Sequence, residues 1–62
     1  MNYDKIKNTL DTVVFEFWSN CNDRDIIQNA YYLLKKEIEE GLIPNSYKYH
    51  AELQLLQLKL GV

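Results

Sequence analysis

Hydrophobic residues recur every three or four positions near the start of the chain, which is the period of one face of an α-helix. This stripe consists of Tyr3, Ile6, Leu10, Val13, Val14 and Phe17. Asn2 is suited to cap such a helix, and Asp4 in the first turn favours the positive end of the helix dipole. The pattern predicts a first helix over residues 3–19.

A second periodic segment follows the polar stretch "SNCNDRD", whose Asn and Asp residues favour turns and helix caps. Its hydrophobic positions are Ile26, Ile27, Ala30, Tyr31, Leu33, Leu34 and Ile38. Asn22 or Asp23 can cap this helix, and Gly41 supplies the left-handed conformation that commonly closes one. We therefore predict a second helix over residues 23–40.

The segment "LIPNS" connects this helix to a third, because Pro44 disfavours helical geometry at Ile43. Asn45 or Ser46 can cap the helix that follows, which we predict over residues 46–60. Three helices joined by short turns predict an all-α fold, a small three-helix bundle that forms a single domain over residues 1–62.

The third helix carries two hydrophobic stripes on nearly opposite sides. The first contains Tyr49, Leu53, Leu56 and Leu60, and the second contains Tyr47, Ala51, Leu55, Leu58 and Val62. A helix that is apolar on opposite sides is either surrounded by its own chain or shared with another. Two other helices are too few to surround it, so we assign the first stripe to the core and the second to another chain.

Three alternatives to this assignment stay open. The two stripes can be exchanged, with the second in the core, or fraying over residues 58–62 can leave a few leucines exposed. The alternation of "LQLKLGV" also fits a strand over residues 56–62, although Leu, Gln and Lys are better helix formers.

Aromatic residues outside the predicted core face extend the candidate interface, because such residues dominate the energetics of protein interfaces. Phe15 falls on the polar side of the first helix, Trp18 lies at the edge of its stripe, and Tyr32 projects from the polar side of the second helix. The predicted protein interface is the set Tyr47, Ala51, Leu55, Leu58, Val62, Phe15 and Trp18. A helix position misjudged by one residue would instead bury Phe15 and Trp18.

Length and cysteine content point to self-association. A chain of 62 residues buries only about 60% of its unfolded surface and needs some addition to its core. Cys21 is the single cysteine, so no internal disulfide is possible, which favours a reducing, cytoplasmic location. No apolar run approaches a membrane span, and we expect no membrane partner. We expect a homodimer.

Candidate chemistry is sparse. His50 and Cys21 are the only residues of their types, and a zinc site or a nucleophilic centre needs more ligands or an orienting group. The two glycines stand far apart and form no phosphate-binding loop. We therefore expect no metal, no cofactor and no enzymatic activity.

The function that these patterns favour is a protein–protein interaction module that binds itself, a host protein, or both, as a regulator or inhibitor. Residues 33–56 resemble the helix, Gly-Leu-Ile turn and Tyr-bearing helix of short bacterial oligomerisation hairpins, which implies self-association. The abundance of Asn, Lys, Ile and Tyr in a short chain is typical of low-GC bacteria and their phages. The alternative is a helix-turn-helix nucleic-acid-binding protein, but the net charge of −2 and the leucine-rich third helix do not favour it.

Overall fold

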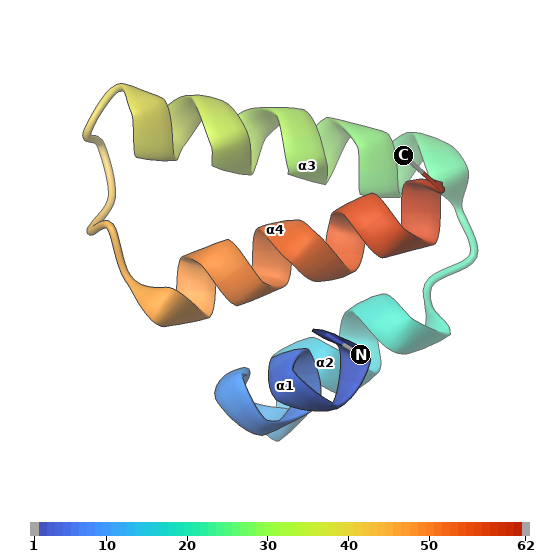
Figure 1. The fold of residues 1–62 in the computed structure, drawn as a ribbon. Coiled ribbons are helices and arrows are strands. Elements are labelled where there is room, and N and C mark those ends of the chain that lie inside the picture. The colour runs from blue at the N-terminus through green and yellow to red at the C-terminus, as the bar shows by residue number, and fades with distance from the viewer. Residues whose placement is uncertain (1, 62) are drawn as a thin grey trace.

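Four α-helices make up the fold of residues 2–61, which the computed structural model describes (Figure 1). They are α1 (Asn2–Thr9), α2 (Thr12–Asn20), α3 (Arg24–Glu39) and α4 (Tyr47–Leu60). The prediction of an all-α fold is confirmed for these residues. The prediction of three helices is wrong, because the expected first helix over residues 3–19 is divided into α1 and α2.

The break between α1 and α2 falls at Leu10 and Asp11. Asp11 has extended backbone angles, φ −61° and ψ 142°, although no glycine or proline stands near it. At about 100° per residue, a continuous helix would place Phe15 on the side roughly opposite Ile6, so a single face could not bury both. The bend brings both side chains into the core.

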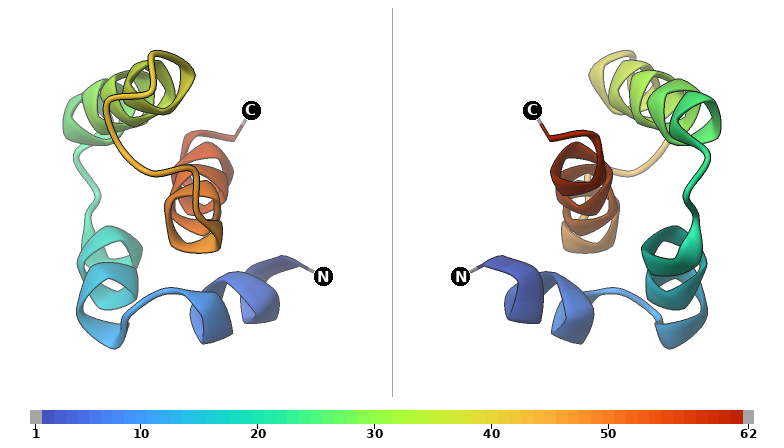
Figure 2. Two further views of the ribbon diagram at one scale, coloured as in Figure 1. Left: turned by 90° about the vertical axis from the view of Figure 1, so that its left-hand side faces the viewer. Right: turned by 90° about the vertical axis from the view of Figure 1, so that its right-hand side faces the viewer.

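α4 is the central helix and packs against each of the other three. α3 lies alongside it, and α1 and α2 lie on its other side (Figure 1). Seen along α4, the three helices surround it on three sides and leave one side open (Figure 2). The buried side chains form a single core that consists of Ile6, Leu10, Phe15, Trp18, Ile27, Leu34, Ala51, Leu55, Leu56 and Leu60.

α3 and α4 begin and end within one residue of their predicted bounds, because local signals define their ends. The Asp23 side chain accepts hydrogen bonds from the backbone N–H groups of Asp25 and Ile26, at 3.0 and 3.3 Å. Ser46 caps α4 in the same way. Gly41 closes α3 with a φ of 72°, a left-handed conformation that glycine adopts without steric cost.

The C-terminal end of α4 is helical as far as Leu60, so the strand alternative for residues 56–62 is wrong over that part of its length. Val62 lies outside the described residues. The guanidinium of Arg24 donates to the carbonyl oxygen of Leu60 at 2.9 Å, and the ammonium of Lys59 donates to that of Ser19 at 3.0 Å. Cations at helix C-termini satisfy carbonyls that have no partner within the helix. These two contacts fix the end of α4 against α2 and α3.

Candidate interaction surface

The second stripe of α4 is divided between the core and the surface. Leu55 is completely buried (0% exposed) and Ala51 is buried, whereas Tyr47 is 89% exposed and Leu58 is 43% exposed. The first stripe is also in the core, with Leu56 and Leu60 buried and Tyr49 and Leu53 packed against the core. The premise that α4 buries only one stripe within its own chain was therefore wrong, because the bend provides a further helix that covers the second stripe.

Phe15 and Trp18, the two aromatic residues of α2 assigned to the interface, are buried in the core. The Phe15 ring meets that of Tyr3 edge to face, with 5.4 Å between ring centroids. The Trp18 indole donates from Nε1 to Oε2 of Glu52 on α4, at 2.9 Å. These contacts correct the prediction that Phe15 faces solvent, and they show that Trp18 joins α2 to α4. Tyr32, on α3, does project into solvent (65% exposed).

The uncovered side of α4 carries four side chains that we name the free face of α4: Tyr47, His50, Gln54 and Leu58. All four are exposed. Tyr47, Gln54 and Leu58 are seven and four residues apart, so they form one line along the helix. Of the residues predicted to form the interface, Tyr47 and Leu58 are the described ones that remain on the surface.

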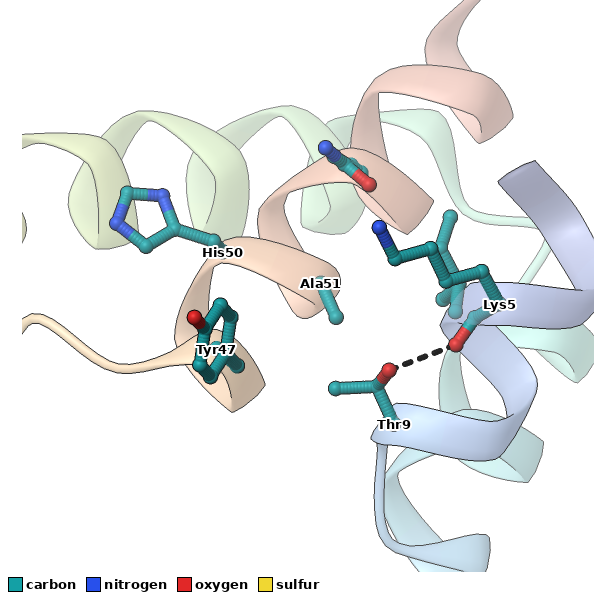
Figure 3. A pocket seen from close by; sticks show the side chains of 7 residues that line it. Lys5, Thr9, Tyr47, His50 and Ala51 are labelled. Atoms are coloured by element: carbon teal, nitrogen blue, oxygen red, sulfur yellow. Dashed lines mark hydrogen bonds between the residues drawn. The ribbon is translucent and has the colours of Figure 1, made fainter.

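A groove beside this face separates α1 from α4 (Figure 3). Its volume is about 370 Å³, and its lining residues are Lys5, Ile6, Thr9, Tyr47, His50, Ala51 and Gln54. Buried Ile6 and Ala51 form its apolar floor. Thr9, whose hydroxyl donates to the Lys5 carbonyl oxygen at 2.7 Å, faces Ala51 across the groove (Figure 3). We refer to it as the α1–α4 groove.

Polar groups on the rim of the α1–α4 groove can act as hydrogen-bond donors. They include the Lys5 ammonium, the Tyr47 hydroxyl and the Gln54 amide. The His50 ring is hydrogen-bonded to the side chain of Asn45 in the connection before α4, which orients the ring at one end of the groove. An apolar floor with donors at its edge suits a ligand segment that combines small apolar side chains with carboxylate or carbonyl oxygens.

A second group of exposed hydrophobic side chains lies on α2. Val13 is 78% exposed and Phe17 is 60% exposed. The Phe17 ring packs edge to face against Trp18, with 4.9 Å between centroids. Both residues belong to the stripe from which the first helix was predicted, so their predicted place in the core was wrong. The bend turns Val13 and Phe17 away from α4 and turns Phe15 and Trp18 toward it, while Val14 of the same stripe stays packed against the core.

The basic residues of α4 are engaged within the chain. Lys48 forms an ion pair with Asp11 at 3.2 Å, and Lys59 donates to α2 as described above. A recognition helix needs a free face with basic and polar groups directed at nucleic acid. The free face of α4 carries neither Lys48 nor Lys59, so these lysines give the helix-turn-helix alternative no support.

The two residues with potential for nucleophilic or metal chemistry line different hollows. His50 lines the α1–α4 groove, whereas Cys21 lines hollows beside α2 and the start of α3. Among residues 2–61, no group of three or more His, Cys, Asp or Glu side chains is placed to hold a metal ion.

Comparison with protein-family models, with curated proteins and with solved structures found no match to this chain. None of the helices described is long and apolar enough to cross a membrane. The all-α fold and its exposed surfaces are therefore the basis on which a function can be argued.

Proposed function

We propose that this protein is a protein-interaction module, a regulator or inhibitor that binds another protein through the free face of α4 and the α1–α4 groove. The observation that carries this proposal is the exposure of Tyr47 and Leu58 on a side of α4 that α1, α2 and α3 leave uncovered. Large exposed side chains beside a groove are typical anchors of protein interfaces, and tyrosine is enriched among them.

A helix of the partner is the segment that fits this surface best. The line of Tyr47, Gln54 and Leu58 repeats with the spacing at which two helices interdigitate. Ala51, at the floor of the groove, is small enough to let a partner approach the backbone of α4 closely. The donors of Lys5, Tyr47 and Gln54 favour a partner helix that carries a carboxylate between its apolar positions.

We also propose that the chain forms a homodimer and that it acts in the cytoplasm of a bacterial cell, as a host-encoded or phage-encoded protein. Dimer formation would remove from water side chains that the single chain leaves exposed, Val13 and Phe17 among them. A reducing compartment would keep the free thiol of Cys21 unpaired.

Capture of partners from a bacterial lysate tests the binding surface. The protein is immobilised as wild type, Tyr47→Ala, Leu58→Glu and Tyr32→Ala. The matched control is Tyr32→Ala, because Tyr32 is also an exposed tyrosine but lies on α3, outside the proposed surface. Circular dichroism first establishes that all four proteins are folded.

We expect a protein that binds wild type and Tyr32→Ala to be lost with Tyr47→Ala and with Leu58→Glu. Truncation of an interface anchor costs about 2 kcal/mol or more, which corresponds to at least a roughly thirtyfold loss of affinity. Equal capture by all four proteins would reject the free face of α4 as the binding surface. If wild type captures no protein, the proposal is rejected for the proteins of that lysate.

A further inference from the structure

Residues 3–17 contain a hydrophobic pattern that the observed fold only partly uses. Tyr3, Ile6, Leu10, Val13 and Phe17 are spaced three, four, three and four residues apart, which is the repeat of a helix that pairs with another helix. Only Ile6 and Leu10 of these five are buried, whereas Tyr3, Val13 and Phe17 are exposed. The bend at residues 10 and 11 therefore interrupts a stripe that a straight helix would complete.

Two contacts join α1 to α2 across the bend, and Tyr3, an exposed residue, makes both: its ring meets that of Phe15 edge to face, and its hydroxyl lies 3.4 Å from that of Ser19. Few interactions at the bend itself hold it. It spans two residues, and the Asp11 side chain, although Asp11 is the N-cap of α2, makes no capping hydrogen bond. Its ion pair with Lys48 joins two exposed side chains, and such pairs contribute little to stability. Helical hydrogen bonds reach the bend from both sides, from the N–H of Leu10 to Ile6 and from the N–H of Phe15 to Asp11. A change at Asp11 to helical backbone angles would join α1 and α2 and give the first N–H groups of α2 the acceptors they lack.

A straight helix would withdraw α1 from α4 of its own chain and leave Ala51 and Leu55 without their cover. A second copy of this chain carries the same α1, so its Ile6 and Leu10 fit the vacated surface by the contacts that the structure already shows. Exchange of an identical element between two copies is called domain swapping, and short hinges favour it.

The exposed residues of α2 acquire a role in such an exchange. In a continuous helix, about 100° per residue places Val13 and Phe17 within roughly 60° of Ile6 and Leu10. Phe15 and Trp18 would still face α4 of their own chain, so Val13 and Phe17 would face the second copy. The straight helix would then lie between the two copies, with one hydrophobic side for each.

We propose that two copies of this chain exchange α1. In each copy α1 and α2 join into one helix over residues 2–20, and α1 packs on α4 of the other copy. Val13 and Phe17 then lie in the interface between the copies. This inference deepens the proposed homodimer and rests on it, but it is independent of binding to another protein through the free face of α4. The α1–α4 groove persists in the dimer, formed by α1 of one copy and α4 of the other.

Thr12→Pro distinguishes the bent chain from the straight one, and Thr12→Ala is its control. Thr12 is exposed and is the first residue of α2, the helical position that best accepts proline. Asp11 already has the extended conformation preferred before proline. In a continuous helix the same proline would lose the hydrogen bond to the carbonyl of Asn8 and clash with it. Alanine is compatible with both forms and favours a helix.

Light scattering after gel filtration, over a series of concentrations up to the solubility limit, measures the result. We expect dimers of wild type and Thr12→Ala, and a folded Thr12→Pro monomer whose dimer dissociation constant is raised at least about a hundredfold. A dimer of Thr12→Pro with unchanged affinity would overturn the exchange of α1 but leave the homodimer standing. A wild-type monomer throughout the series would overturn both.

Disulfide trapping gives a second measurement that does not depend on proline. Thr9→Cys and Ala51→Cys, combined with Cys21→Ser, place one thiol on each side of the α1–α4 groove. Oxidation at high protein concentration should link two chains covalently if α1 is exchanged, so non-reducing gels should show a dimer band that disappears on reduction. Formation of internally linked monomer alone would overturn the exchange.

Discussion

Leu55→Ala should destabilise this protein far more than Leu58→Ala. Both leucines lie on α4, three residues apart, so the two substitutions change helix propensity equally. Leu55 has no solvent-exposed surface, whereas Leu58 is nearly half exposed. The difference between the two variants therefore reports burial alone.

The size of the effect follows from this burial. Truncation of a fully buried leucine costs about 2.7–5 kcal/mol, because the transfer free energy of the lost atoms and the cavity they leave add together. A chain of 62 residues has a total free energy of unfolding of about 3–9 kcal/mol. Leu55→Ala should thus remove about 30% or more of the free energy of unfolding and lower Tm by at least about 10 °C. For Leu58→Ala we expect a loss of at most about 1 kcal/mol.

Urea and thermal unfolding followed by circular dichroism measure both variants. Each is examined at two protein concentrations, since the stability of a dimer depends on concentration. Similar losses for the two variants, or a loss below about 1 kcal/mol for Leu55→Ala, would contradict the placement of Leu55 in the core. That result would return Leu55 to the interface to which the sequence first assigned it.

Three further substitutions test the contacts that define the helices, each by urea unfolding against wild type. Asp23→Ala should cost about 1 kcal/mol, because it removes the acceptor for two N–H groups at the start of α3. Gly41→Ala should lower the free energy of unfolding by about 1 kcal/mol, because alanine is strained at a φ of 72°. The space around Gly41 is open, so we expect no steric clash beyond this strain. Trp18→Phe should cost about 2 kcal/mol, because the Glu52 carboxylate loses its indole donor; Glu52→Gln keeps an acceptor and should cost less. A greater loss for Glu52→Gln than for Trp18→Phe would contradict the importance of that hydrogen bond.

The sequence predicts α3 and α4 well because their boundaries depend on local interactions. Asp23, Gly41 and Ser46 act on backbone groups within a few residues, so their effects can be inferred without knowledge of the fold. The hydrophobic period of α3 also indicates its buried side through Ile27 and Leu34, although Ile26 and Leu33 of the same set are exposed. Four of the seven residues predicted to form an interface are instead in the core: Phe15, Trp18, Ala51 and Leu55.

The division between α1 and α2 was missed because its cause is mainly tertiary. One local signal was present: Asp11 and Thr12 are weak helix formers, and Asp is favoured at helix N-caps. That signal competes with a stripe that continues through Val13 to Phe17. The burial of Phe15 and Trp18 against α4 favours the bend over the straight helix. This burial depends on contacts between residues more than 30 positions apart, as between Trp18 and Glu52.

The two errors of the sequence interpretation, in α2 and in α4, have a common origin. A hydrophobic pattern identifies which sides of a helix are apolar but does not identify which chain covers them. The bend supplies the helix that covers Ala51 and Leu55, and the same bend exposes Val13 and Phe17. No surface within one chain covers the whole stripe from Tyr3 to Phe17. A second copy of the chain would cover the rest of it. Thr12→Pro tests this directly, because proline at this position is compatible with the bent chain and incompatible with the straight helix.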